Sequence, residues 1–159
     1  MPSTYEPIAT TTGTGSSGTI TFTSIPSTYT DLILVQTGAS SVSSQVIEIR
    51  FNNDSGSNYS RIYVIGNGTG ASSGRDTNNT SVLAGLVEAN TNTIVHIQNY
   101  SNATTYKTCL IRNNVINTFT AAVVGLWRST AAINRVDILV GSGSWNTTAT
   151  FTLYGIKAA

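Results

Sequence analysis

Apolar and polar side chains alternate along most of this chain with a period of two residues. The clearest run spans residues 45–51, in which Ile47, Ile49 and Phe51 fall on one side and the residues between them on the other. Successive side chains of a β-strand point to opposite faces, so this period predicts a half-buried strand. Similar runs predict strands at residues 19–23, 31–35, 61–65, 82–88, 93–100, 106–112, 121–127, 135–140 and 149–156.

Turn-forming residues separate these runs roughly every dozen residues, which is typical of all-β domains. Residues 52–58 are dense in Asn, Asp, Ser and Gly, and a hairpin is the simplest connection for them to make. Residues 66–79 hold almost no apolar side chains and predict a long exposed loop. Residues 82–87 could instead form a helical turn. The absence of a sustained helical period predicts one all-β domain, an antiparallel β-sandwich or a barrel.

The first eighteen residues differ in composition from the rest. They are rich in Thr, Ser and Gly, and predict an N-terminal arm or lead-in (residues 1–18) before a single domain at residues 19–159. An arm that lies against a neighbouring subunit and a disordered tail both fit this composition. Tyr5, Pro7 and Ile8 are its apolar groups, and we expect them at an assembly interface.

Charged residues are scarce, at 9% of the 159 residues, whereas about 25% is typical of soluble domains. The hydrophobic share of 40% is enough for a core. A net charge of +1 without a basic run offers little for binding nucleic acid or a charged membrane surface. The chain begins without the pattern of a secretion signal and has no membrane-length apolar run, so we expect synthesis and assembly in a cytoplasm.

Groups that could carry catalysis or bind a metal are few and dispersed. The single histidine, His96, lies in a strand-like run, and the seven carboxylates occur one at a time. We therefore expect no enzyme, no cofactor and no metal site within one chain, although copies of His96 around a symmetry axis could still bind a metal. Residues 52–58 resemble a calcium loop but lack its closing acidic residue, and a turn explains them equally well. Cys109 is expected to be a buried thiol.

Aromatic side chains in the predicted strands have two plausible uses. They can fill a core or an interface, or they can stack on the sugars of a glycan; the candidates are Tyr59, Tyr63, Trp127 and Trp145. Trp127 and Arg128 are adjacent and belong to residue types enriched at interface centres. We therefore include this pair among the candidate interface residues, while core packing is favoured for Trp127.

Several segments carry packing and turn motifs in a specific order: Phe51–Ser60, Asn99–Asn102 with Thr105–Thr108, Val124–Ile133 and Phe151–Ala159. Together with Ile20–Leu32, these segments resemble a family of small virion proteins from tailed bacteriophages, notably phages that infect cyanobacteria. The likeness covers nearly the whole chain. Because the motifs concern packing and turns, the resemblance brings no catalytic residues with it.

The resemblance implies a jelly-roll-like β-sandwich that forms symmetric oligomers on a virion. The expected role is that of a capsid decoration (cement) protein on the capsid surface, a homotrimer whose partners are its own copies and the phage major capsid protein. A tail or fibre-tip module that binds a host glycan through residues 66–79 and nearby aromatic side chains is the alternative. The scarcity of charge fits either contact role, because a surface with few charges costs little to desolvate.

Overall fold

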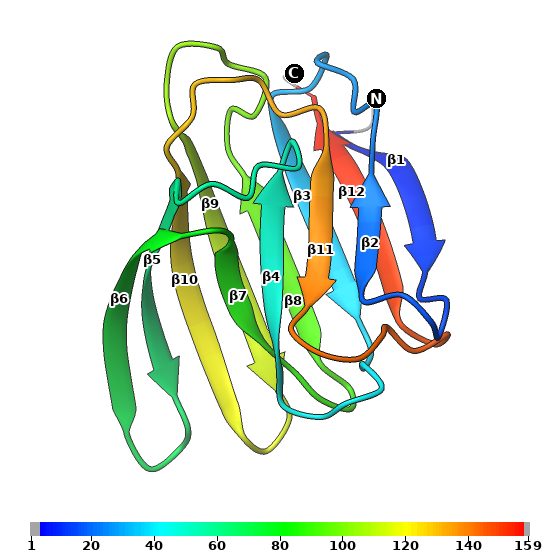
Figure 1. Ribbon diagram of the computed structural model, residues 1–159, viewed down its shortest axis with the longest axis vertical. Helices are drawn as coiled ribbons and strands as arrows, with labels where there is room; N and C mark the ends of the chain where they lie inside the picture. Colours follow the sequence, from blue (N-terminus) through cyan, green and yellow to red (C-terminus); the bar gives the residue numbers. More distant parts are fainter. Residues whose placement is uncertain (1–3, 158–159) are drawn as a thin grey trace.

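The computed structural model describes residues 4–157, which fold into β-strands and connecting loops (Figure 1). The twelve strands are β1 (Tyr5–Thr12), β2 (Thr19–Phe22), β3 (Asp31–Thr37), β4 (Gln45–Phe51), β5 (Tyr59–Gly66), β6 (Ala71–Asn79), β7 (Val82–Val87), β8 (Asn92–Ile97), β9 (Lys107–Val115), β10 (Phe119–Trp127), β11 (Val136–Val140) and β12 (Thr150–Ile156). This described part of the chain contains no helix that could cross a membrane.

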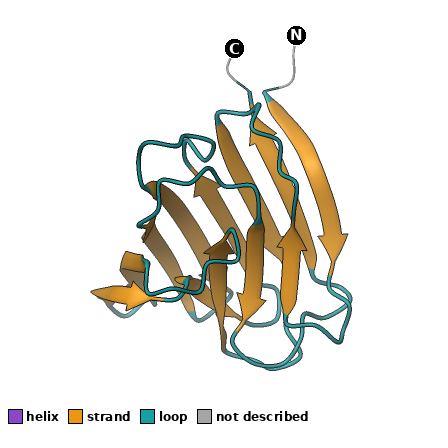
Figure 2. Ribbon diagram, turned by 45° about the horizontal axis from the view of Figure 1, so that its top comes forward, coloured by secondary structure: helices purple, strands orange, loops and turns teal. Residues whose placement is uncertain are grey.

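The strands form two antiparallel sheets that face each other (Figure 2). The large sheet has eight strands in the order β1-β12-β3-β8-β9-β10-β5-β6, and the small sheet has four in the order β2-β11-β4-β7. The predicted all-β antiparallel sandwich is therefore confirmed.

The core lies between the sheets and follows the predicted alternation. Ile47, Ile49 and Phe51 of β4 are buried, as expected from their shared side of the strand. On the large sheet, Cys109 and Ile111 of β9 point inward and are buried in the same apolar cluster. The prediction that Cys109 is a buried thiol is confirmed.

Residues 52–58 connect the two sheets and do not form the predicted hairpin. They lead from β4 in the small sheet to β5 in the large sheet. Asn52 and Asn53 both adopt left-handed backbone conformations, with φ of 54° and 57°, which turns the chain sharply out of β4. Alternation along β4 and β5 indicates two strands but does not show that they belong to different layers.

Residues 5–12, where an arm or tail was expected, instead form the edge strand β1. They pair with β12 from Tyr5 opposite Ile156 to Thr12 opposite Thr150, with an irregularity between Pro7 and Ala9. Backbone hydrogen bonding to β12 can hold this segment despite its low apolar content. A proline is tolerated here because an edge strand has backbone groups that need no partner strand.

The predicted loop at residues 66–79 is largely a strand as well. Only its start forms a turn, in which the Asn67 side-chain oxygen accepts hydrogen bonds from the Thr69 and Gly70 backbone nitrogens at 3.1 and 2.9 Å. The remainder is β6, which pairs with β5 at the other edge of the large sheet. Residues 82–87 form β7, so the alternative of a helical turn is wrong.

The two ends of the described chain lie side by side. β1 and β12 are neighbours at one edge of the large sheet (Figure 1). The Lys157 backbone nitrogen donates to the Thr4 carbonyl oxygen at 3.1 Å, and the Lys157 ammonium contacts the Glu6 carboxylate at 2.6 Å. Both ends are thereby tied to the same sheet edge.

Candidate interaction surface

The outward face of the large sheet carries a row of mostly apolar side chains. Residues that are directly opposed in successive strands, from β1 to β5, form this row: Pro7, Tyr154, Ile33, His96, Leu110, Val124 and Ile62. Opposed residues of antiparallel strands lie about 4.5–5.5 Å apart, so their side chains form a continuous band. We call these seven residues the outer apolar row.

The part of this row over β9, β10 and β5 is the most exposed. The side chains of Ile62, Val124 and Leu110 are 58%, 50% and 44% exposed, and Val64, in the next row, is 52% exposed. A hollow of about 560 Å³ lies over these residues. Single exposed apolar side chains are ordinary, whereas a contiguous group indicates an interaction site.

Two of the three N-terminal candidate residues lie on this same face. Pro7 is a member of the outer apolar row, and Tyr5 lies opposite Ile156 and lines the hollow. Ile8 sits at the irregularity of β1 and packs against the core instead. Tyr5 and Pro7 reach the surface through strand pairing and not through a separate arm.

Trp127 and Arg128 lie elsewhere and hold residues 52–58 in place. Trp127 is buried, stacks on the Tyr59 ring with centroids 6.2 Å apart, and donates from Nε1 to the Asp54 carboxylate at 2.7 Å. Arg128 donates to the Ser57 carbonyl oxygen at 2.7 Å. The core position favoured for Trp127 is confirmed, and an interface role for this pair stays a prediction.

The carboxylate of Asp54 is occupied by protein donors. It accepts from Trp127 Nε1, from Asn58 Nδ2 at 3.0 Å and from the Gly56 nitrogen at 2.8 Å. Burial raises the pKa of the Asp54 carboxyl. The three hydrogen bonds together outweigh this effect, so the pKa lies below its ordinary value. The segment thus has the contacts of a turn, and residues 4–157 contain no group of three or more potential metal-ligating side chains.

Most of the aromatic side chains considered for sugar stacking are in the core. Tyr59 and Trp145 are fully buried, and Trp145 packs edge-on against Phe151 with centroids 4.9 Å apart. Tyr63 is partly buried, with the Arg61 guanidinium 4.5 Å from its ring centroid. These positions leave little aromatic surface for a glycan.

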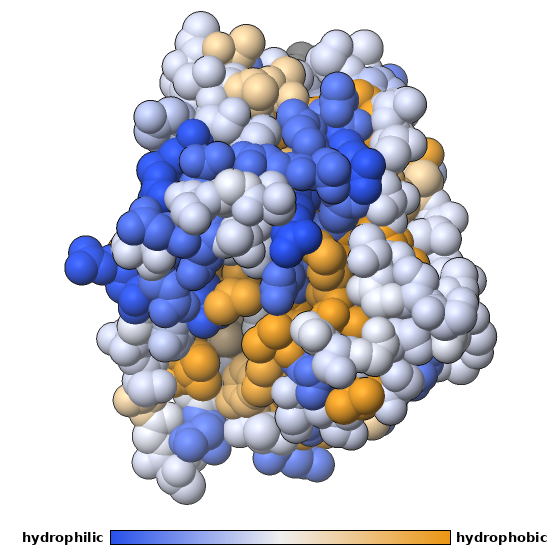
Figure 3. All heavy atoms as spheres, in the orientation of Figure 1, coloured by the Kyte–Doolittle hydropathy of each residue, from blue (hydrophilic) through white to orange (hydrophobic). Residues whose placement is uncertain are grey.

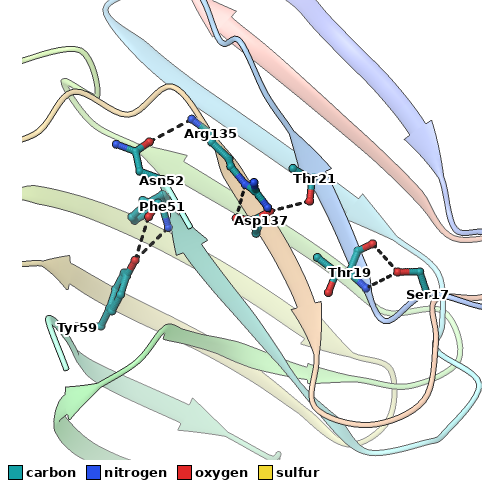
Figure 4. Close-up of polar contacts among 8 residues, drawn as sticks. All are labelled: Ser17, Thr19, Thr21, Phe51, Asn52, Tyr59, Arg135 and Asp137. Carbon is teal, nitrogen blue, oxygen red and sulfur yellow. Dashed lines mark hydrogen bonds and ion pairs between the residues drawn. The ribbon is translucent and has the colours of Figure 1, made fainter. Parts of the chain in front are cut away.

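The outward face of the small sheet has a different character. Asp137 of β11 accepts from the Arg135 guanidinium at 2.8 Å and from the Thr21 hydroxyl at 2.6 Å (Figure 4). Figure 3 shows this side of the molecule, with strongly hydrophilic side chains mostly in its upper part and a hydrophobic patch at and below its centre. In this polar part, the side chains of Thr21, Arg135 and Asp137 are therefore bonded to one another.

The hydrophobic part of this side adjoins a groove between the sheets. The groove measures about 340 Å³ and is lined in part by Val46 and Leu86 of the small sheet and by Tyr63 and Phe119 of the large sheet. It lies beside β7, the edge strand of the small sheet. It is a second apolar surface, distinct from the outer apolar row.

Sequence reasoning missed the outer apolar row in part because some of its strands, such as β10, are apolar on both sides. In β10, Ala121 and Val123 point inward while Ala122 and Val124 point outward. Such a run cannot be distinguished by its pattern from a strand that is buried on both faces. In a domain with only two layers, a strand with apolar residues on both sides is the signal that could have indicated an uncovered face.

His96 interrupts the row with a polar side chain; it lies in β8, within a predicted strand, and is partly exposed. Its Nε2 lies 2.8 Å from the Asp31 carboxylate, whose other oxygen accepts from the Asn99 nitrogen at 2.7 Å. The histidine thus has a fixed partner within the chain. It interrupts the apolar band with a satisfied polar group.

No protein-family model matches the chain, and no curated protein is significantly similar to it. The fold is established by its strand pairing, and its function has to be inferred from its surfaces.

Proposed function

We propose that this protein is a virion structural protein, and within that class a capsid decoration (cement) protein that self-associates and stabilises a phage shell. The outer apolar row supports this proposal, because an uncovered apolar face needs a partner. The sequence resemblance supplies the virion as the place where that partner is found. In this proposal the protein works by contact and not by catalysis.

The dimensions of the large sheet suit a protein partner. Eight strands spaced about 4.8 Å apart and about 20 Å long cover roughly 700 Å². A stable interface commonly buries about 800 Å² on each partner. The outward face therefore has the size of a protein contact, while the groove beside β7 provides a separate apolar surface for contact between copies.

The strand order supports the jelly-roll prediction. The small sheet contains β2, β4, β7 and β11, and the chain passes to the large sheet after each of them. Greek-key connections between two facing sheets are typical of jelly rolls. In this interpretation, the β9–β10 hairpin, which lies between β8 and β5, and the β1–β12 pair extend the large sheet beyond the eight strands of a jelly roll.

Cryo-electron microscopy of virions that carry this chain is the direct test. We expect density for the two-sheet sandwich on the capsid surface. Density confined to the tail would favour the glycan-binding alternative, and absence from the virion would refute the proposal. Sedimentation of the purified 16.7 kDa chain tests self-association, for which a trimer is expected and a monomer at all concentrations would be contrary.

A further inference from the structure

Two arginine side chains lie at the margins of the exposed part of the outer apolar row. Arg75 of β6 is directly opposite Ile62, and Arg112 of β9 is directly opposite Ala122. Both arginines are exposed. Because β6, β5, β10 and β9 are consecutive in the sheet, the two residues stand about 14 Å apart across the strands.

The space between these arginines is apolar. Ile62 and Val124 oppose each other in one row, and Val64 and Ala122 in the next. All of these side chains are exposed. The surface therefore combines an apolar floor with one cation at each of two opposite corners.

Arg75 and Arg112 are also the cationic side chains of residues 4–157 that have no hydrogen bond or ion pair within the chain. The others are engaged: Arg50, Arg61, Lys107, Arg128, Arg135 and Lys157. Every acidic side chain is engaged too: Glu6, Asp31, Glu48, Asp54, Asp76, Glu88 and Asp137. The chain thus keeps two unpaired cations on one face and no unpaired carboxylate in its described part.

This imbalance distinguishes between possible partners. A protein that covers Ile62 and Val124 would also displace water from the neighbouring guanidinium groups, which is unfavourable unless each group meets an acceptor. A second copy of this chain would bring only carboxylates that already have partners. An acidic polysaccharide would supply charge but no apolar side chains for the floor.

We propose that this face docks a different protein, whose surface places apolar side chains over Ile62 and Val124 and a carboxylate against each of Arg75 and Arg112. Arginine binds carboxylates through paired hydrogen bonds, which would fix the orientation of the docked protein. The inference rests on the proposed function, and within it assigns this face to the shell protein and not to self-association.

The test compares full-length wild-type protein with R75Q/R112Q and with T19E/S55E. Both double variants change the net charge by −2, and Thr19 and Ser55 are exposed residues away from the large sheet's outward face. The probe is shells purified from virions and stripped of this protein, with binding measured by co-sedimentation. We expect R75Q/R112Q to bind about tenfold more weakly or worse, and T19E/S55E to bind like the wild type.

A third variant, V124S, tests the apolar floor, and we expect it to weaken shell binding while leaving sedimentation of the free protein unchanged. Thermal unfolding confirms that each variant is folded. Equal shell binding by all variants would overturn the inference and leave the proposed function standing. Loss of self-association in V124S or in R75Q/R112Q would assign the face to a second copy and overturn the inference. Loss of shell binding in R75Q/R112Q but not in V124S would indicate an anionic ligand and would also overturn it. Failure of the wild type to bind shells would refute both proposals.

Discussion

The Tyr59 hydroxyl accepts a hydrogen bond from the Phe51 backbone nitrogen at 3.1 Å, although the two residues belong to different sheets. The same hydroxyl lies 3.1 Å from the Asp54 carbonyl oxygen. Tyr59 is fully buried, and burial raises the pKa of its hydroxyl well above the ordinary value, so the group stays neutral. This contact fixes the crossing of the chain between the layers.

Tyr59→Phe should lower the free energy of unfolding by about 1–3 kcal/mol, because a buried backbone N–H loses its acceptor. Urea unfolding measures the change. Tyr106→Phe is the matched control, since Tyr106 is 56% exposed, and a change within about 0.5 kcal/mol is expected there. Equal effects of the two substitutions would contradict a structural role for the Tyr59 hydroxyl.

The hydrogen bonds to Asp54 predict a loss of stability in acid. Because the pKa of Asp54 is below its ordinary value in the folded state, the unfolded state takes up the proton first as the pH falls. The contribution of Asp54 is therefore complete above about pH 4 and is lost as the pH falls through the folded-state pKa. Thermal unfolding between pH 6 and pH 2 should show the wild type approaching Asp54→Asn in stability, whereas a constant difference would contradict this account.

Gly125→Ala should destabilise the protein through crowding. A Cβ atom at this position would lie 2.6 Å from Val82 Cγ1 and 2.7 Å from Cys109 Sγ, and both neighbours are buried. Overpacking of this kind costs about 1–3 kcal/mol. Gly70→Ala is the control, because a Cβ atom there would meet nothing within 4 Å. Denaturant unfolding of both variants measures the difference, and similar stabilities would refute the packing described around Gly125.

Cys109 should be unreactive in the folded protein. Its side chain is 1% exposed, and burial raises the pKa of the thiol to about 12, so neither access nor thiolate is available at pH 8. Labelling with a thiol reagent should be negligible in buffer and complete in denaturant. Because Cys109 is the single cysteine of the chain, all labelling comes from this side chain. Rapid labelling of the native protein would contradict its burial.

Removal of residues 1–12 should destabilise the sandwich. The deletion takes away β1 and leaves the β12 backbone unpaired along one side. We expect a loss of more than about 2 kcal/mol, since several hydrogen bonds worth about 1 kcal/mol each disappear. Hydrogen exchange should become faster in β12 while β9 stays protected. Unchanged exchange and stability would mean that the segment is a dispensable arm after all.

Much of this fold could be predicted because burying one face of a strand imposes a period of two residues. That signal locates β4 through Ile47, Ile49 and Phe51, and it locates the other strands that line the core. It is absent from β1 and β6, which are edge strands with few buried side chains. It also cannot assign a strand to a sheet, and for that reason the connection at residues 52–58 was misread.

The candidate surface could be predicted only in part. Tyr5 and Pro7 were noticed because apolar groups stand out in a polar segment. Ile62 and Val124 were not, because the adjacent Tyr63 and Val123, which face the core, are apolar too, and alternation between two apolar sides gives no direction. The missing information is which face the second sheet covers, and this depends on pairing between strands distant in sequence.

The hydrogen bond between Lys157 and Thr4 has a practical consequence for engineering. Because the first and last described residues meet at one sheet edge, a peptide fused at either end would be displayed from the same place on each copy. A short linker across this point should allow circular permutation, with new termini opened in the exposed turn at residues 67–70. That rearrangement would move a displayed peptide from one end of the large sheet to its opposite edge.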